Sequence, residues 1–270
     1  MTQLDTARFQ STDRYIAYLE TTEGKLRLDL GWMNLREFLP TAATTEQALD
    51  VGSGTGPFAF RLAELGFTVD LLDVSDAMLA VAREQAHDRG LSHRTSFHHG
   101  DGRSLWDLFE PSSFDVVVCH NVLEYQEEPL AALRGLAHVL KKDGKSVASV
   151  LVRNRHGEVL KAAIKSNDCA LAESVLTADT VLESLYGEPV RVFDPTDLRS
   201  MMKRAGLRVV AERGVRVVSD YMDCAALANG DYTRLQKLEL LLGAKPEFAA
   251  IARYTQFIAR ASARSSGAQL

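Results

Sequence analysis

The residues with the clearest chemical potential form a glycine-rich segment, LDVGSGTG, at residues 49–56. Its three glycines allow the backbone to turn sharply and to approach a ligand closely. The segment lies between an apolar run typical of a strand and an amphipathic run typical of a helix. Because the first N–H groups of a helix are unpaired and carry the positive end of its dipole, a carboxylate or phosphate of a ligand can bind there.

Two acidic residues accompany this turn. Asp50 lies two residues before Gly52, where it could accept a hydrogen bond from the ammonium group of a ligand. Asp73 ends the next apolar run, and a carboxylate at such a strand end can bind both hydroxyls of a ribose. A dinucleotide site would need a further glycine at the position of Pro57. The pattern therefore departs from that of dinucleotide enzymes, although ribose binding fits it.

Polar pairs also follow the third and fourth predicted strands, at Asp101-Gly102 and His120-Asn121. These four pieces, in this order on successive strands, resemble the class I S-adenosylmethionine-dependent methyltransferases. The resemblance implies that Asp101 and Gly102 lie near the adenine and that His120 lines the methyl-donor site. The chain is then expected to bind S-adenosylmethionine.

The elements that must position these residues alternate between strands and helices from residue 46 to about 152. Such alternation with short connections predicts an α/β fold with a doubly wound, mostly parallel sheet. The run 207–219 predicts either a strand pair or one long bent strand. We expect seven strands in all, at residues 47–51, 68–74, 95–101, 114–120, 145–152, 207–219 and 248–261.

A single domain is expected over residues 1–270, because no linker, repeat or low-complexity tract divides the chain. Residues 1–40 predict two helices that could close over the donor as a lid. Residues 153–193 and 220–245 break the strand–helix rhythm and are interpreted as helical insertions near the ligand-binding end.

The composition is that of an ordinary globular protein, with 46% hydrophobic and 25% charged residues. No run approaches 18 apolar residues and the N-terminus has no signal-peptide pattern, so we expect a cytoplasmic protein without a membrane partner. The three cysteines read as buried free thiols, and no metal-binding pattern is present. A net charge of −5 gives no global attraction to DNA or RNA, although a local basic patch would suffice for RNA.

A narrower resemblance extends over nearly the whole chain. Its segments include Tyr18 with residues 21–27, residues 120–125, residues 154–157, residues 214–221 and the run 238–254. They resemble the bacterial tRNA 5-carboxymethoxyuridine methyltransferases, which implies methylation of the carboxylate of that wobble nucleoside. The residues implied by this resemblance, together with those of the glycine-rich segment, give the expected donor-binding set: Arg27, Asp50, Gly52, Ser53, Gly54, Gly56, Asp73, Asp101, Gly102 and His120.

The chain departs from that family in its first insertion, where residues 176–188 hold no Lys or Arg although the family carries lysines there. The acceptor is therefore either tRNA or a small molecule, namely an organic acid, an amine or a phenol. A donor-binding module without catalysis is the alternative from another class. An RNA enzyme should show a positive stripe leading to the donor cleft, and a small-molecule enzyme should show a closed apolar pocket.

The acceptor side can also be predicted from chemistry. A carboxylic acid is ionised at neutral pH and needs no general base, only a cation or hydroxyl to hold it in line with the donor. Arg216 and Tyr221 are our candidates for this carboxylate clamp, with Arg153 and Arg155 as further cations. An amine or hydroxyl acceptor would need a base, for which His120 and His156 are candidates.

Overall fold

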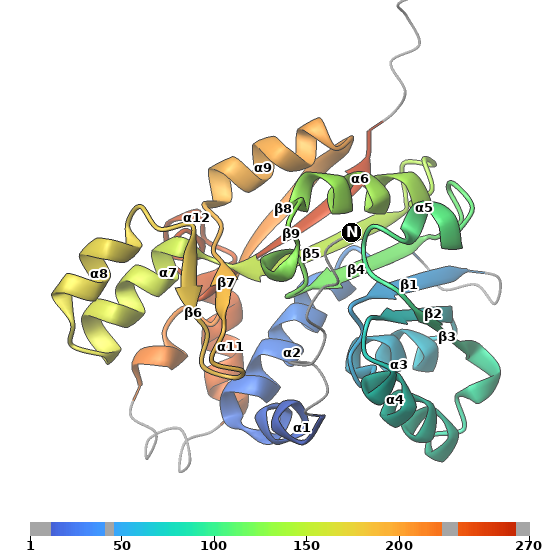
Figure 1. Ribbon diagram of the computed structural model, residues 1–270, viewed down its shortest axis with the longest axis horizontal. Helices are drawn as coiled ribbons and strands as arrows, with labels where there is room; N and C mark the ends of the chain where they lie inside the picture. Colours follow the sequence, from blue (N-terminus) through green and yellow to red (C-terminus); the bar gives the residue numbers. More distant parts are fainter. Residues whose placement is uncertain (1–11, 41–45, 223–231, 263–270) are drawn as a thin grey trace, which may run out of the picture.

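A seven-stranded sheet forms the centre of the protein in the computed structural model, which describes residues 12–40, 46–222 and 232–262 (Figure 1). The strand order is β3-β2-β1-β4-β5-β9-β8. The β5–β9 and β8–β9 pairs are antiparallel and the other pairs of this sheet are parallel, so the predicted mostly parallel sheet is confirmed. The strands are β1 (Gln47–Val51), β2 (Thr68–Asp73), β3 (Thr95–His99), β4 (Val116–His120), β5 (Val147–Arg153), β8 (Leu207–Val215) and β9 (Tyr254–Ala261).

Helices cover both faces of the sheet, which explains why the central strands are apolar throughout. Every residue of β5 is buried, as expected for a strand enclosed on both faces. The helices α5 (Leu105–Leu108), α6 (Pro129–Val139) and α9 (Pro195–Arg204) lie on one face. The other face carries α2 (Thr22–Arg36), α3 (Pro57–Glu64) and α4 (Asp76–Asp88).

The topology brings many strand ends to one edge. The chain moves outward from β1 through β2 to β3 and then returns to β4 on the other side of β1, which creates a crevice at the carboxyl ends of the strands. Because β9 runs the opposite way, Tyr254 at its start pairs with both Arg153 and Val215, at the ends of β5 and β8. The beginning of β9 therefore lies at the same edge.

The structure decides between our two alternatives for residues 207–219 and corrects two other expectations. Residues 207–215 form one strand, with an irregular register between Val209 and Ala211, so the second of our alternatives holds. The predicted strand 248–261 begins only at Tyr254, because α12 (Pro246–Ala249) precedes it. Cys119 is buried as expected, whereas Cys169 is exposed; Cys224 lies outside the described residues.

The insertion at 153–193 is helical only in its first half. It contains α7 (Arg155–Leu160), a π-helical turn η4 (Lys161–Lys165) and α8 (Cys169–Val175). An antiparallel hairpin of β6 (Thr180–Leu182) and β7 (Pro189–Arg191) follows, so the prediction of a helical insertion is wrong for this part. Strands of three residues are too short to show a period of two in the sequence.

The remaining elements lie near the two ends of the chain. α1 (Thr12–Glu20) precedes α2 and buries none of its residues completely. The second insertion contains a short 3₁₀ turn η5 (Ser219–Tyr221) and α11 (Tyr232–Gly243), whereas residues 223–231 of it lie outside the described part. In the described residues, no helix is both long enough and apolar enough to span a membrane.

Candidate active site

A cavity of about 650 Å³ opens at the carboxyl edge of the sheet. Its walls come from α1 and α2, from the ends of β1 to β5, from the insertion at 153–193, and from the segments around Arg216 and Tyr254. A volume of this size is typical of a small-molecule or cofactor site. The cavity therefore lies where the glycine-rich segment and the strand-end acids were predicted to meet.

The glycine-rich loop forms the floor of this cavity. Gly52 and Gly54 line it, with φ angles of 69° and 55° that favour glycine. A Cβ atom at Gly52 would lie 2.2 Å from Cγ2 of Val122, so no larger residue fits there. Gly56 instead precedes the first residue of α3 with a φ of 82° and does not line the cavity; its role is to start that helix.

Asp73 faces the cavity from the end of β2 and is held rigidly. Its Oδ2 atom accepts a hydrogen bond of 2.7 Å from the N–H of Gly54, and its Oδ1 atom accepts one of 2.9 Å from the N–H of Ser75. Each carboxylate oxygen keeps a second lone pair for a ligand hydroxyl. The loop and the acid are thus fixed relative to each other before any ligand binds.

A smaller adjoining cavity lies under the glycine loop and contains Asp50 and Ser53. Burial, followed by the nearby charge of Asp73, raises the pKa of Asp50 to about 8. The Oγ of Ser53 and the Nε of Arg27 are buried without a hydrogen-bond partner among the described residues. Unsatisfied polar atoms beside a buried acid are suited to a ligand that carries both an ammonium and a carboxylate group.

Arg27 extends from the middle of α2 into both cavities. Its guanidinium donates a hydrogen bond to Oδ1 of Asn121 and lies 5.1 Å from the ring centroid of Tyr18. Asn121 follows β4 with a φ of 55° and donates its own amide N–H to Glu124 at 2.9 Å. The left-handed backbone thus turns Asn121 toward the arginine.

Asp101 and Gly102 line the cavity beyond β3, as the resemblance implied. The carboxylate of Asp101 accepts hydrogen bonds from Nε and Nη2 of Arg103, at 3.0 and 2.7 Å. These contacts hold the pKa of Asp101 below its usual value despite partial burial. A Cβ at Gly102 would lie 3.2 Å from Ala132 of α6, which leaves little room for a side chain.

His120 lines the cavity at the end of β4 and is a poor base. Its Nε2 lies 2.7 Å from Oγ of Ser149, and its ring packs edge-on against Phe58 at 4.5 Å between centroids. Burial, then the charge of Arg27, lowers the pKa of His120 to about 3. His156 lies outside the cavity lining and pairs with Asp194 at 3.1 Å.

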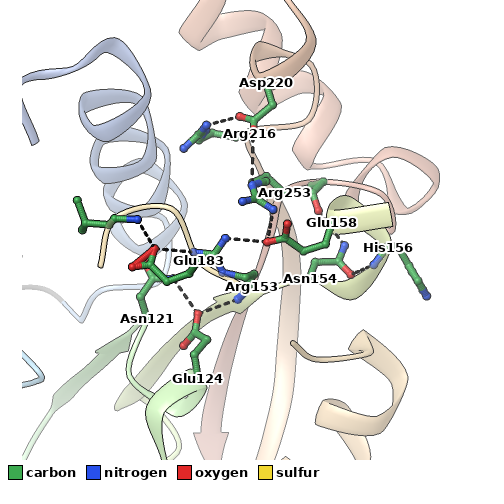
Figure 2. Close-up of polar contacts among 12 residues, drawn as sticks. Asn121, Glu124, Arg153, Asn154, His156, Glu158, Glu183, Arg216, Asp220 and Arg253 are labelled. Atoms are coloured by element: carbon green, nitrogen blue, oxygen red, sulfur yellow. Dashed lines mark hydrogen bonds and ion pairs between the residues drawn. The ribbon is translucent and has the colours of Figure 1, made fainter. Parts of the chain in front are cut away.

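Buried arginines and carboxylates alternate at the other end of the cavity (Figure 2). Arg153 lies 2.7 Å from Glu158 and 3.9 Å from Glu183, and Arg253 also pairs with Glu158. The Nε of Arg253 lies 3.2 Å from Asp220, which in turn pairs with Arg216. We call these residues the arginine network: Glu183, Arg153, Glu158, Arg253, Asp220 and Arg216.

The predicted clamp of Arg216 and Tyr221 is placed differently from our expectation. Arg216 lines the cavity with a φ of 62°, a conformation that costs a non-glycine residue about 1–3 kcal/mol. Tyr221 does not line it, because the 3₁₀ turn directs its hydroxyl into the protein, where it is buried without a hydrogen-bond partner in the described part of the chain. The hydroxyl beside Arg216 belongs to Tyr18, whose oxygen accepts a hydrogen bond of 3.3 Å.

Sequence reasoning assigned no role to three residues of this end of the site: Tyr18, Arg253 and Tyr254. The ring centroid of Tyr254 lies 5.5–5.8 Å from the guanidinium carbons of Arg153, Arg216 and Arg253. All three guanidiniums are therefore held around one aromatic ring. The sequence signals were the presence of Tyr18 and the run 238–254 among the segments of the narrower resemblance, and the polar run Arg-Tyr-Thr-Gln at residues 253–256 inside a predicted strand.

A family model described as a methyltransferase domain matches residues 43–206, which is more than half of the chain. The chain belongs to the S-adenosylmethionine-dependent methyltransferases. A tRNA 5-carboxymethoxyuridine methyltransferase from Escherichia coli O157:H7 is 28% identical over 242 residues, 89% of this chain and 90% of that protein. A ubiquinone biosynthesis O-methyltransferase from Thiobacillus denitrificans is 28% identical over 67% of this chain and 70% of its own length.

Solved structures agree in fold. The CcbJ methyltransferase from Streptomyces caelestis has a TM-score of 0.63 and 20% identity, covering 97% of this chain and all of the other. The family model confirms the predicted enzyme class and donor, and the solved structure agrees with the predicted fold. The cavity residues fit S-adenosylmethionine, because the glycine floor admits close backbone approach and Ser53 and Arg27 offer unsatisfied polar atoms. When bound, S-adenosylmethionine would supply an electrophilic methyl group to an acceptor.

Proposed function

We propose that this methyltransferase esterifies a carboxylate, and that its acceptor is the carboxylate of 5-carboxymethoxyuridine in tRNA. The observation that carries the proposal is the guanidinium of Arg216, which faces the cavity with the hydroxyl of Tyr18 beside it. The Tyr18 oxygen accepts a hydrogen bond from Arg216, and its hydroxyl also forms a hydrogen bond with the side chain of Tyr254. A substrate oxygen that accepts the Tyr18 proton would replace Tyr254 as its partner. A guanidinium and a hydroxyl together match the needs of an anionic acceptor.

The chemistry of an ester-forming transfer agrees with the residues present. A carboxylate oxygen attacks the methyl carbon, the carbon–sulfur bond breaks, and its electron pair stays on the sulfur, so no proton leaves the acceptor. An amine or phenol would lose a proton and would favour a general base. His120 has a pKa lowered to about 3 by burial and is already bound to Ser149, so it suits this role poorly.

The relative from Escherichia coli supports the more specific acceptor. That relative is a tRNA 5-carboxymethoxyuridine methyltransferase, and the match covers 89% of this chain. The match at 28% identity extends over most of both proteins, which supports a shared class of substrate. The cation and hydroxyl on the acceptor side supply a chemical reason for that substrate to be a carboxylate.

A small organic acid is the second candidate acceptor, and the β6–β7 hairpin favours it. Glu183, Leu185 and Tyr186 of this hairpin line the cavity, and residues 176–188 contain no Lys or Arg that could contact an RNA backbone. Phosphate contacts usually supply most of the nonspecific affinity for nucleic acid.

The deciding experiment supplies purified protein and S-adenosylmethionine to tRNA isolated from cells unable to esterify 5-carboxymethoxyuridine. Mass spectrometry of the digested nucleosides should show a gain of one methyl group, reversed by mild alkali, which hydrolyses esters. The Asp73→Ala variant serves as a control for donor-dependent transfer. Unchanged tRNA, together with methylation of small acids in a cell extract, would replace the tRNA acceptor with the second candidate.

A further inference from the structure

The π-helical turn between α7 and α8 brings two lysines to the wall of the acceptor end. Lys161 and Lys165 are four residues apart, about one turn of this helix, and both line the cavity. The wider turn is closed by the N–H of Ser166, which donates to the carbonyl oxygen of Lys161 at 3.1 Å. Turns of this kind are rare and occur frequently at functional sites.

Neither ammonium group has a carboxylate within ion-pair distance in the described ranges 12–40, 46–222 and 232–262. The charges of Glu158 and Asp220 act on Lys161, but the ion pairs of Glu158 are with Arg153 and Arg253. The arginine network contains three guanidiniums and three carboxylates, and each of these carboxylates already has an arginine as its ion-pair partner. Burial, then the charge of Arg253, lowers the pKa of Lys161, an effect that a bound anion would oppose.

The side chains of Lys161 and Lys165 favour a phosphate over a carboxylate. Arg presents a planar fork that matches a carboxylate with two parallel hydrogen bonds, whereas Lys acts as a compact point charge. Two ammonium groups on adjacent turns suit a tetrahedral group with several oxygens, which can accept from both at once. We infer that Lys161 and Lys165 form a subsite for a phosphate attached to the acceptor, so that the acceptor is a nucleotide.

This inference rests on the proposed function, since it specifies the acceptor of that same site. It also explains how a chain without lysines in residues 176–188 could bind RNA: the phosphate contact comes from the π turn and not from the hairpin. The carboxylate would then face Arg216, while the phosphate of the same nucleotide would lie against Lys161 and Lys165.

Calorimetric titration of the full chain saturated with S-adenosylhomocysteine tests the subsite without methyl transfer. The probes are uridine, uridine 3′-monophosphate and uridine 5′-monophosphate, each with and without the 5-carboxymethoxy group. At least one monophosphate should bind roughly tenfold or more tightly than its nucleoside, as expected for charge-assisted contacts. Lys161→Met and Lys165→Met should each remove most of that gain and leave the affinity for the nucleoside unchanged.

Lys203→Met is the matched control, because Lys203 is an exposed lysine on α9 outside the cavity lining. It should keep the full preference for the monophosphate. Equal binding of nucleoside and monophosphates, or an equal loss for both in the lysine variants, would overturn the subsite. So would a small dicarboxylic acid whose binding needs both lysines while the monophosphates bind without them.

The outcomes separate this inference from the proposed function. A lysine-dependent preference for unmodified uridine monophosphates, without any methylation of tRNA, would retain the phosphate subsite and reject the carboxylate acceptor. Methylation of tRNA without a lysine-dependent preference for phosphate would retain the carboxylate acceptor and reject the phosphate subsite. In the first of these cases the acceptor would still be a nucleotide, with another group as the methyl acceptor.

Discussion

Asp50 and Asp73 are both buried carboxylates of the donor site, but their surroundings differ. Asp73 accepts hydrogen bonds from the backbone of Gly54 and Ser75. Asp50 accepts a hydrogen bond from the backbone of Ala59, which lowers its pKa and so opposes the effect of burial. Burial therefore dominates at Asp50 and raises its pKa to about 8. Its protonated form stabilises the fold at low pH, and this stabilisation is lost as the pH rises from about 4 through 8.

We predict that donor binding releases a proton from Asp50. The donor ammonium would favour the ionised carboxylate, so the affinity for S-adenosylhomocysteine should rise with pH up to about 8 and then level off. Titration calorimetry in buffers of different ionisation enthalpy should report about one proton released per ligand at pH 6–7. Asp50→Asn should abolish the release; a wild-type protein without it would show that the ammonium lies elsewhere.

If Arg216 and Tyr18 hold the carboxylate of the acceptor, removal of the Tyr18 hydroxyl should reduce turnover and removal of the Tyr221 hydroxyl should not. Tyr18→Phe keeps the ring against Arg27 and removes the hydroxyl beside Arg216. Because a charge-assisted hydrogen bond contributes about 1.5–3 kcal/mol, kcat/KM for the carboxylate acceptor should fall about 10- to 100-fold. Tyr221→Phe, the matched control, should leave turnover unchanged because its hydroxyl does not reach the cavity.

Arg216→Met should reduce turnover at least as much as Tyr18→Phe does. Calorimetry should show that both variants retain the affinity of the wild type for S-adenosylhomocysteine. A parallel loss of donor affinity, or full turnover in the Tyr18 variant, would move the carboxylate to another position. Arg216→Met also leaves Asp220 with one partner fewer, so its folding should be checked by circular dichroism before its turnover is interpreted.

At the scale of elements, α1 and the β6–β7 hairpin are suited to act as a lid. Helix α1 contributes Arg14, Tyr15 and Tyr18 to the cavity wall, yet it buries none of its residues completely. The hairpin contributes Glu183 and Tyr186 to the same cavity. Helix α1 has little buried surface and can open at low free-energy cost. The hairpin buries Val190 and Glu183, so its opening would cost more.

We predict that donor binding protects these two elements selectively. Amide hydrogen exchange in residues 12–20 and 180–191 should slow by up to about 100-fold when S-adenosylhomocysteine is present at 100 times its Kd. Helix α9, which contributes no residue to the cavity lining, is the internal control and should exchange at the same rate with and without the ligand. Unchanged exchange in residues 12–20 would exclude the lid role of α1.

How far the sequence predicts each element depends on how local its signal is. The glycine loop and the acids at strand ends were predictable, because each depends on a few neighbouring residues. The β6–β7 hairpin was missed because its strands have three residues each. Tyr18, Arg253 and Tyr254 were given no role because they meet only through the insertion of β9 between β5 and β8, which no local pattern reveals. Tyr221 was misplaced because the 3₁₀ turn of residues 219–221, which no local pattern predicted, directs its hydroxyl into the protein.

At the scale of the whole molecule, the arginine network connects segments that are far apart in the sequence. Glu158 belongs to the insertion, Arg153 ends β5, and Arg253 precedes β9. Figure 2 shows Glu158 between the two arginines. Removing the charge of a central partner from a buried pair typically costs about 3–5 kcal/mol.

Glu158→Gln should therefore lower the free energy of unfolding by about 3–5 kcal/mol, measured by urea denaturation. Glu173→Gln on α8 is the matched control, because Glu173 is exposed and should change the value by less than about 0.5 kcal/mol. If the two variants unfold at the same urea concentration, the network contributes nothing to stability and serves only to orient its guanidiniums.

The late position of β9 in the chain has a consequence during protein synthesis. The loop and acids of the donor site, residues 50–120, leave the ribosome more than 130 residues before Arg253 and Tyr254. Until β9 enters the sheet between β5 and β8, Arg153 and Arg216 have no common ring around which to gather. A nascent chain would thus contain the loop and acids of the donor site first and would gather the acceptor-side arginines only after β9 has been synthesised. Premature termination within β9 would leave the residues of the donor loop in the chain but remove the ring around which those arginines gather.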